Sequence, residues 1–208
     1  MSKQGFFEAY REAFGPLKED QVVGLEFLLD KLVELPPSSL EHAAYMLATV
    51  KHETADTYQP VKEGYWIKNA EQWRKNNLRY YPWYGRGYVQ LTWEYNYRKA
   101  SQLLHMDLTT DPDAVMEPTT SYMILLRGMQ EGWFTGKKLN DYINKTEKNY
   151  VAARRIINGV DRAVTVASYA KKFEPCLKNI ISEQKDTEPP PAPSRPTSIS
   201  LQGTKAPK

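Results

Sequence analysis

The stretch SSLEHAAYMLATVKHETADT, residues 38–57, has the pattern of a helix with one buried face. The hydroxyl of Ser38 can cap the start of this helix while Glu41 reaches back, which is the spacing of a capping box. Apolar residues then recur at helical intervals, at Leu40, Ala43, Ala44, Leu47 and Val50. We therefore predict a core helix that runs to about Thr57.

Further helices are predicted on both sides of this core helix. Two precede it, at residues 3–14 and 17–35, and each ends at a Gly-Pro or Pro-Pro pair. Four follow it, at residues 93–104, 119–131, 147–157 and 161–182. Alternation of β-branched residues is scarce, and only GYVQLTW at 87–93 could form a short strand or an extended segment. The expected fold is a mainly α-helical domain with little or no β structure.

Two segments depart from the helical pattern. Residues 58–97 lose clean periodicity and contain twelve Tyr and Trp residues, which predicts a long irregular, aromatic-rich segment. From residue 185 onward the chain is rich in Pro and Ser and almost free of large apolar side chains, so burial cannot repay the entropy of ordering it. We predict one folded domain at residues 1–184 and a disordered tail at residues 185–208.

The composition excludes several classes of protein. The chain has 208 residues with 41% hydrophobic and 25% charged side chains, as in ordinary globular proteins. The sequence contains no run of eighteen apolar residues that could span a membrane. The N-terminus lacks the apolar stretch of a signal peptide. Cys176 is the single cysteine, so it has no partner for a disulfide. The net charge of +3 is too small to indicate nucleic-acid binding. We expect a cytoplasmic location and no stable insertion into membranes.

Two carboxylates, Glu53 and Glu63, stand ten residues apart where the core helix gives way to a loop. Partial burial and the negative end of the helix dipole both disfavour the charged form of Glu53, which suits a general acid. Glu63 lies in a loop that is more open to solvent, where an ionised carboxylate could act as a base. Considered singly, the position of Glu53 favours a paired rim glutamate, and that of Glu63 favours an exposed loop charge. The pair matters only if the fold sets both residues across one cleft.

Other chemistries are not supported by the sequence. HETAD begins like a zinc-protease helix, but the residue four after His52 is Asp56, so we expect no metal site. GRGYVQLT lacks the lysine and serine of a phosphate-binding loop, and no Gly-x-Ser-x-Gly stretch marks a serine nucleophile. We expect no cofactor.

Four segments in order, KHETADTYQPVKE, YYPWYGRGYVQLTWEYNY, GMQEGWFTGKKLNDY and ARRIINGVDRA, resemble the family 19 glycoside hydrolases. The similarity extends over most of residues 5–180 and is greatest to the compact branch of bacteriophage and prophage endolysins. This resemblance implies a lysozyme-like helical architecture and cleavage of β-1,4 bonds between N-acetylated sugars with inversion.

The resemblance also implies roles for individual residues. Glu53 matches the general acid, Glu63 the base, and Thr92 the residue that helps to hold the attacking water. Glu71 remains an alternative base, because the loop between the carboxylates is much shorter than in plant-type enzymes. Gln90 and Asn158 match substrate-binding residues, although Val160 replaces the last glycine of the family's NGG segment.

The aromatic segment suggests further contacts with the substrate. Aromatic faces with polar edges suit sugar rings, so Tyr58, Tyr84 and Tyr88 are candidates to bind sugars. Half or more of these aromatic residues could instead pin the irregular segment to the helices. His52 is expected to support the acid, and Arg86 either pairs with a catalytic carboxylate or forms a structural ion pair.

The function expected from these observations is that of a monomeric endolysin that hydrolyses peptidoglycan. Without a signal peptide it would wait in the host cytoplasm until a holin-type, membrane-permeabilising protein releases it to the wall. Three alternatives remain: a chitinase that acts on chitin oligomers, a non-hydrolytic wall-binding or virion protein, and a protein whose tail lyses membranes.

Overall fold

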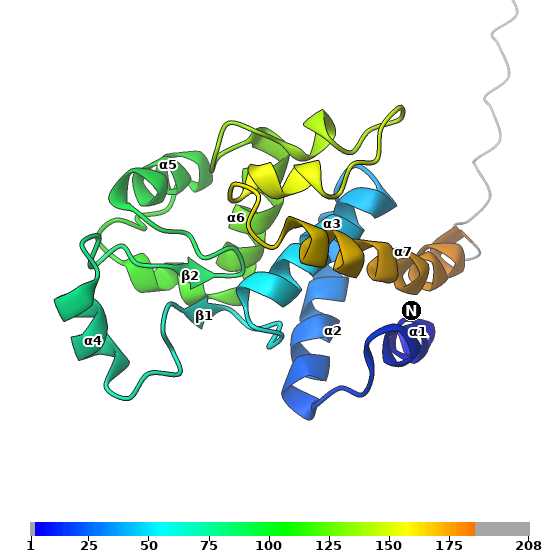
Figure 1. The fold of residues 1–208 in the computed structure, drawn as a ribbon, viewed down its shortest axis with the longest axis horizontal. Helices are drawn as coiled ribbons and strands as arrows, with labels where there is room; N and C mark the ends of the chain where they lie inside the picture. The colour runs from blue at the N-terminus through cyan, green and yellow to red at the C-terminus, as the bar shows by residue number, and fades with distance from the viewer. Residues whose placement is uncertain (1–2, 186–208) are drawn as a thin grey trace, which may run out of the picture.

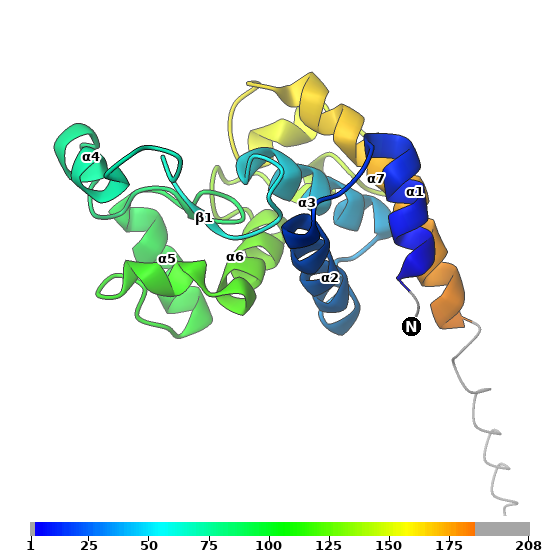
Figure 2. The ribbon, with the colours of Figure 1, turned by 90° about the horizontal axis from the view of Figure 1, so that it is seen from below.

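Helix α3 (Leu40–Glu53) forms the centre of the fold, and every residue from His42 to Lys51 in it is buried. A helix buried all round needs neighbours on every side. Helices α6 (Pro118–Glu131) and α7 (Ala163–Lys185) both pack against α3 in this computed structural model, which describes residues 3–185 (Figure 1). Helix α1 (Gln4–Phe14) lies along α7, as Figure 2 shows. The predicted core helix is therefore confirmed, but its burial extends well beyond one face.

Both ends of α3 differ from the prediction. Ser39, not Ser38, caps the helix, because its hydroxyl oxygen accepts a hydrogen bond from the backbone N–H of His42 at 3.2 Å. The helix ends at Glu53, four residues before Thr57. Ala55 and Asp56 adopt φ angles of 49° and 68°, which are incompatible with a continuing right-handed helix. This early end makes Glu53 the last residue of the helix.

A smaller group of elements lies beside the C-terminal end of α3. It contains β1 (Val61–Lys62), α4 (Ala70–Asn77), β2 (Arg86–Gly87) and α5 (Glu94–Leu104), and we call it the small lobe (Figure 1). β1 and β2 pair antiparallel, with Val61 opposite Gly87. Helices α1, α2 (Glu19–Glu34), α3 and α7 form the helical lobe.

The predicted irregular segment contains more order than its sequence suggested. Helix α4 was not predicted, because its sequence AEQWRKNN is almost entirely polar. The segment 87–93, which could form a short strand or an extended segment, contains a strand residue only at Gly87 in β2, since residues 88–90 form a turn in which Gln90 has a φ of 53°. Leu91 then returns to form an isolated bridge with Arg86.

Short 3-10 helices complete the described chain, namely η1 (Pro112–Met116), η2 (Leu139–Asp141) and η3 (Ala152–Ile156). The helix predicted at 147–157 is wrong. Lys148 bridges to Ile143, and the side chain of Asn149 accepts a hydrogen bond from the N–H of Ala152 at 2.9 Å, so only η3 is helical there. Local side-chain hydrogen bonds of this kind compete with a regular helix.

The mainly α-helical, lysozyme-like fold class is confirmed. Within residues 3–185, no helix is long and apolar enough to cross a membrane. The predicted tail begins at Lys185, which is the last residue of α7, and residues 186–208 lie outside the described part of the chain. The boundary between domain and tail stays a prediction.

Candidate active site

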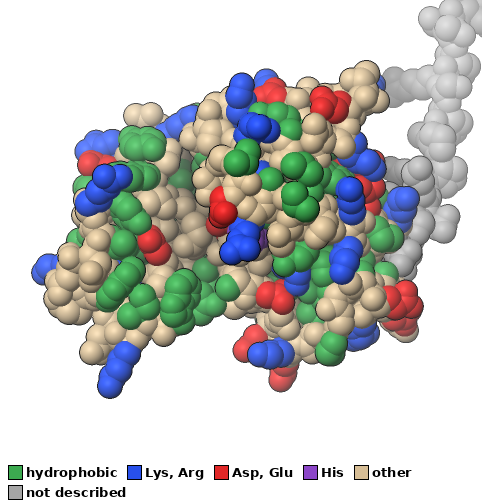
Figure 3. Space-filling view, in the orientation of Figure 1, with side chains coloured by type: hydrophobic (Ala, Val, Ile, Leu, Met, Phe, Trp, Pro, Cys, Tyr) green, Lys and Arg blue, Asp and Glu red, His purple; other side chains and the backbone are tan. Residues whose placement is uncertain are grey.

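The surface is hollowed between the small lobe and the helical lobe, as Figure 3 shows. The C-terminal end of α3 lies beside β1 in both ribbon views (Figures 1 and 2), and β2 pairs with β1. Glu53 ends α3 and Glu63 directly follows β1, so the two predicted catalytic carboxylates come from opposite lobes.

Glu53 is held by an arginine that is far away in sequence. Its Oε1 atom lies 2.6 Å from Nη1 of Arg154 in η3, and its side chain is only 15% exposed. Arg154 is itself fixed, because its Nε donates to the carbonyl oxygen of Asp161 at 2.9 Å. Among the described residues, Oε2 of Glu53 has no hydrogen-bond partner. One carboxylate oxygen is thus anchored while the other is available to a substrate.

His52 precedes Glu53 and is half-buried. Burial lowers the pKa of His52 below its ordinary value, although the neighbouring Glu53 acts in the opposite direction. The imidazole is therefore neutral at neutral pH. Its supporting role stays a prediction.

Glu63 is held by hydrogen bonds from within the small lobe. Oε1 accepts from the hydroxyl of Tyr80 at 2.8 Å, and Oε2 accepts from the N–H of Gly85 at 3.0 Å. Burial and this bond to Glu63 raise the pKa of Tyr80 to about 12, so Tyr80 remains a donor at neutral pH. A Cβ atom at Gly85 would lie 2.7 Å from the side-chain oxygen of Gln90, so a larger residue here would displace the end of the Gln90 side chain.

Glu71, the alternative base, is bound on α4. Its carboxylate accepts hydrogen bonds from Arg74 at 2.9 Å, Tyr81 at 3.0 Å and Tyr84 at 3.2 Å. Burial opposes ionisation, but these bonds outweigh it and keep the pKa of Glu71 below its ordinary value. Glu71 is on α4 and is paired with Arg74, whereas Glu63 directly follows β1. The choice of Glu63 over Glu71 as the base stays a prediction.

Gln90 and Thr92 lie in the turn that follows β2. The side-chain amide of Gln90 donates to the carbonyl oxygen of Val61 at 2.9 Å, which ties the turn to β1. The hydroxyl of Thr92 donates to the carbonyl oxygen of Gln90 at 2.7 Å, so its lone pairs remain available to accept from a water. Both residues are on the lobe that carries Glu63.

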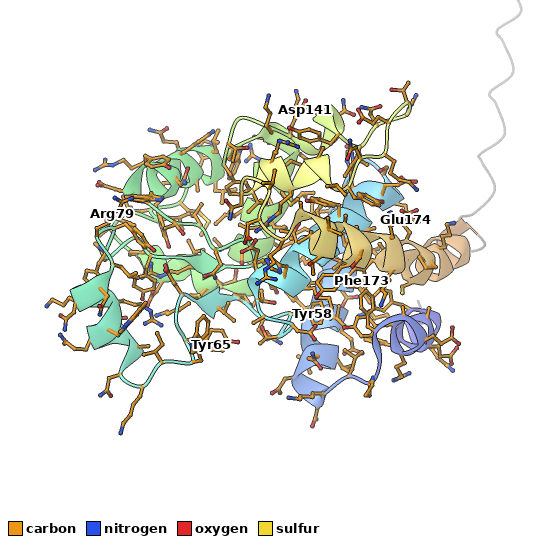
Figure 4. All side chains as sticks on the ribbon, viewed as in Figure 1. Tyr58, Tyr65, Arg79, Asp141, Phe173 and Glu174 are labelled. Carbon is orange, nitrogen blue, oxygen red and sulfur yellow. The ribbon has the colours of Figure 1, made fainter. Side chains whose placement is uncertain are left out.

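The structure corrects the three tyrosines predicted to bind sugars, because Tyr58, Tyr84 and Tyr88 are at most 1% exposed. The hydroxyl of Tyr58 lies 2.6 Å from that of Tyr10 inside the helical lobe (Figure 4). Tyr84 packs under the guanidinium of Arg86, whose carbon lies 3.6 Å from its ring centroid. These rings pin the aromatic segment to the core, which was the alternative interpretation. The large exposed aromatic residues are instead Tyr65, Trp66 and Tyr95.

Arg86 does not pair with a catalytic carboxylate. Its Nε atom lies 2.8 Å from Asp113, and Nη1 donates to the hydroxyl of Tyr97 at 3.0 Å. The structural alternative for Arg86 is therefore correct. Asn158 is exposed and follows Arg154 by four residues, and its Oδ1 accepts from the N–H of Gly159 at 2.8 Å. Its contact with substrate stays a prediction.

Two residues of this site, Arg154 and Tyr80, were not predicted from the sequence. Arg154 lies inside the segment ARRIINGVDRA, but nothing in that segment indicates which of two adjacent arginines meets Glu53. Tyr80 was one of a dense run of aromatic residues, and only the fold selects it as the partner of Glu63. No cluster of three or more potential metal ligands occurs among residues 3–185.

Comparison with known proteins identifies the relatives of this chain. The family model for chitinase class I matches residues 42–137, which include Glu53, Glu63, Glu71, Gln90 and Thr92. An acidic endochitinase of Dioscorea japonica is 36% identical over 125 residues, which cover 57% of this chain and 46% of the relative. Chitinase 5 of Oryza sativa subsp. japonica is 34% identical over 128 residues, which cover 59% of this chain and 40% of the relative. The chain thus spans less than half the length of both relatives.

The fold is also found among solved structures. Chitinase C from Streptomyces griseus HUT6037 superposes with a TM-score of 0.58 at 21% sequence identity, covering 83% of this chain and 76% of that protein. At this identity the match establishes a shared fold.

Proposed function

We propose that this chain is a family 19 glycoside hydrolase that hydrolyses β-1,4 bonds between N-acetylated sugars, and the match of residues 42–137 to the chitinase class I model supports this. The observation that carries the proposal is the anchoring of two carboxylates from opposite lobes, Glu53 by Arg154 and Glu63 by Tyr80 and Gly85. Fixed carboxylates of this kind can act on one bond without reorganisation.

In the proposed reaction Glu53 is the general acid. Its Oε2 protonates the glycosidic oxygen as the sugar develops oxocarbenium character. Glu63 removes a proton from a water that Thr92 helps to orient, and this water attacks the opposite face of the sugar. The bond to the leaving sugar breaks, a new carbon–oxygen bond forms with inverted configuration, and Glu63 receives the proton. Neither step requires a metal or an organic cofactor.

We propose peptidoglycan as the polymer and an endolysin role for the enzyme. The small net charge of +3 slightly favours an anionic polymer, and peptidoglycan carries carboxylates that chitin lacks. In that role the enzyme acts as a monomer on the wall after a holin-type protein has released it from the host cytoplasm. Chitin oligomers are the second candidate, because the relatives named above are an endochitinase and a chitinase.

Digestion of purified peptidoglycan and of chitin oligomers tests the proposal, with mass analysis of the fragments and proton NMR of the new anomeric centre. We expect reducing-end fragments from peptidoglycan that first appear as the α anomer, and none from a Glu53→Gln variant. Anhydro-sugar products would mean a lytic transglycosylase. Cleavage of chitin alone would make the chitinase assignment correct, and equal cleavage by the variant would exclude Glu53 as the acid.

A further inference from the structure

Trp93 is held in an unusual backbone conformation beside the candidate active site. Its φ and ψ angles are 75° and 136°, in a region that non-glycine residues rarely adopt. Its N–H donates to the carbonyl oxygen of Trp83 at 2.8 Å, and Thr92 directly precedes it. The fold therefore fixes the indole ring next to a residue of the proposed water site.

The Trp93 ring connects the proposed base to the outer surface of the small lobe. Its centroid lies 4.8 Å from that of Tyr80, whose hydroxyl binds Glu63. On another side Tyr95, which is 64% exposed, stacks at 6.5 Å with an interplanar angle of 21°. The guanidinium carbon of Arg79 lies 4.9 Å from the Trp93 centroid. Glu63, Tyr80, Trp93 and Arg79 thus form one contiguous row.

Arg79 differs from the other arginines of residues 58–104. Arg74 pairs with Glu71, Arg86 with Asp113 and Arg98 with Glu94. Arg79 is exposed, and within residues 3–185 it has neither a carboxylate within 4.0 Å nor a hydrogen-bond acceptor; Figure 4 shows it on the small lobe. Contact with an aromatic ring restrains a guanidinium but leaves its N–H donors free for a carboxylate.

We propose that Arg79 and Trp93, with Tyr95, form a subsite for a sugar that carries a carboxylate, and that this subsite makes the enzyme prefer peptidoglycan to chitin. This inference rests on the proposed hydrolase function. The carboxylate of the lactyl ether or of the attached peptide binds the guanidinium, while the sugar ring packs against the exposed face of Tyr95. Chitin consists of neutral N-acetylglucosamine and offers Arg79 no such partner.

Arg79→Gln tests the subsite, and Arg98→Gln is the matched control, since Arg98 is an exposed arginine of the same lobe already paired with Glu94. Three substrates are compared: soluble peptidoglycan strands, the same strands with their carboxyl groups converted to methylamides, and chitin oligomers. We expect Arg79→Gln to reduce kcat/KM on the acidic strands about tenfold, mainly through KM, and to change the two neutral substrates less than about twofold. Methylamidation should reduce the wild-type rate similarly and add nothing to the variant.

A uniform loss on all three substrates, or no loss on the acidic strands, would overturn the subsite. Failure of the hydrolase function gives a different result, since the wild type would then cleave no substrate. In that case the Kd of Glu53→Gln protein for acidic and methylamidated strands, with and without Arg79→Gln, decides the inference. The subsite is supported if adding Arg79→Gln to the Glu53→Gln protein weakens binding of the acidic strands but not of the methylamidated strands. It is excluded if the Kd for acidic strands is the same with and without Arg79→Gln.

Discussion

Nη1 of Arg154 lies 2.6 Å from Oε1 of Glu53, although 101 residues separate the two in sequence. The contact joins η3 to the end of α3, and both side chains are largely buried. The position of the proposed acid therefore depends on a part of the chain that is distant from it.

Replacement of Arg154 by Met should impair activity and stability together. Loss of the guanidinium leaves a largely buried carboxylate without its partner, which we expect to lower the free energy of unfolding by about 2 kcal/mol. The freed Glu53 would also move, so kcat should fall roughly 100-fold. Urea unfolding and fragment release measure the two effects. Arg154→Lys should retain part of the wild-type stability and part of the wild-type activity. Full activity of Arg154→Met would contradict the anchoring role.

Two neighbouring tyrosines provide a matched test of the base. Tyr80 donates to Glu63 and Tyr81 donates to Glu71. Tyr80→Phe removes a hydrogen bond to the proposed base while keeping the ring against Trp93, so kcat should fall roughly tenfold with little change in KM. Tyr81→Phe should leave kcat within about twofold of wild type. The reverse order of effects would point to Glu71.

Chemical rescue distinguishes the two carboxylates directly. Glu63→Ala should lose about 10²–10⁴-fold in rate, because no group remains to activate the water. Azide needs no general base, so adding it should restore turnover and give a glycosyl azide of inverted configuration. Glu71→Ala should lose far less activity and show no rescue. An azide product from Glu71→Ala alone would transfer the base role to that residue.

Tyr58 should affect stability and not substrate binding. Its hydroxyl shares a buried hydrogen bond with Tyr10, so Tyr58→Phe should lower the free energy of unfolding by about 1 kcal/mol. KM should stay unchanged, because the side chain has no exposed surface. An increase of KM with unchanged stability would restore Tyr58 to the sugar-binding residues.

His52 should make stability depend on pH. Burial holds its pKa below the ordinary value of 6.5, so the unfolded chain takes up a proton here at a higher pH than the folded chain does. His52 therefore destabilises the folded protein at low pH. This loss of stability is absent well above pH 6.5 and grows as the pH falls from 6.5 through the pKa of His52 in the folded protein. His52→Gln should therefore lose less stability than wild type between pH 7.5 and pH 5. His105→Asn, which alters an exposed histidine, should follow the wild-type slope.

The helical framework was largely predictable from the sequence because its signals are local. The apolar spacing of residues 38–57 and the Gly-Pro and Pro-Pro stops depend only on near neighbours along the chain. Apolar periodicity did not predict the structure in two places. Local hydrogen bonds replace a regular helix around Asn149, and α4 is a helix with an almost entirely polar sequence. The sequence motifs also indicated the family, and with it Glu53 and Glu63 as candidates.

Partners across the fold were decided only by the tertiary structure. Arg154 meets Glu53, Tyr80 meets Glu63 and Asp113 meets Arg86 through contacts between residues 17 to 101 positions apart. Sequence spacing carries no information about such distances, because they depend on how the elements pack. The same packing buried Tyr58, Tyr84 and Tyr88 and left Tyr95 and Arg79 exposed. By itself, the sequence determined which residue types were available, and the fold determined which of them lie at the candidate active site.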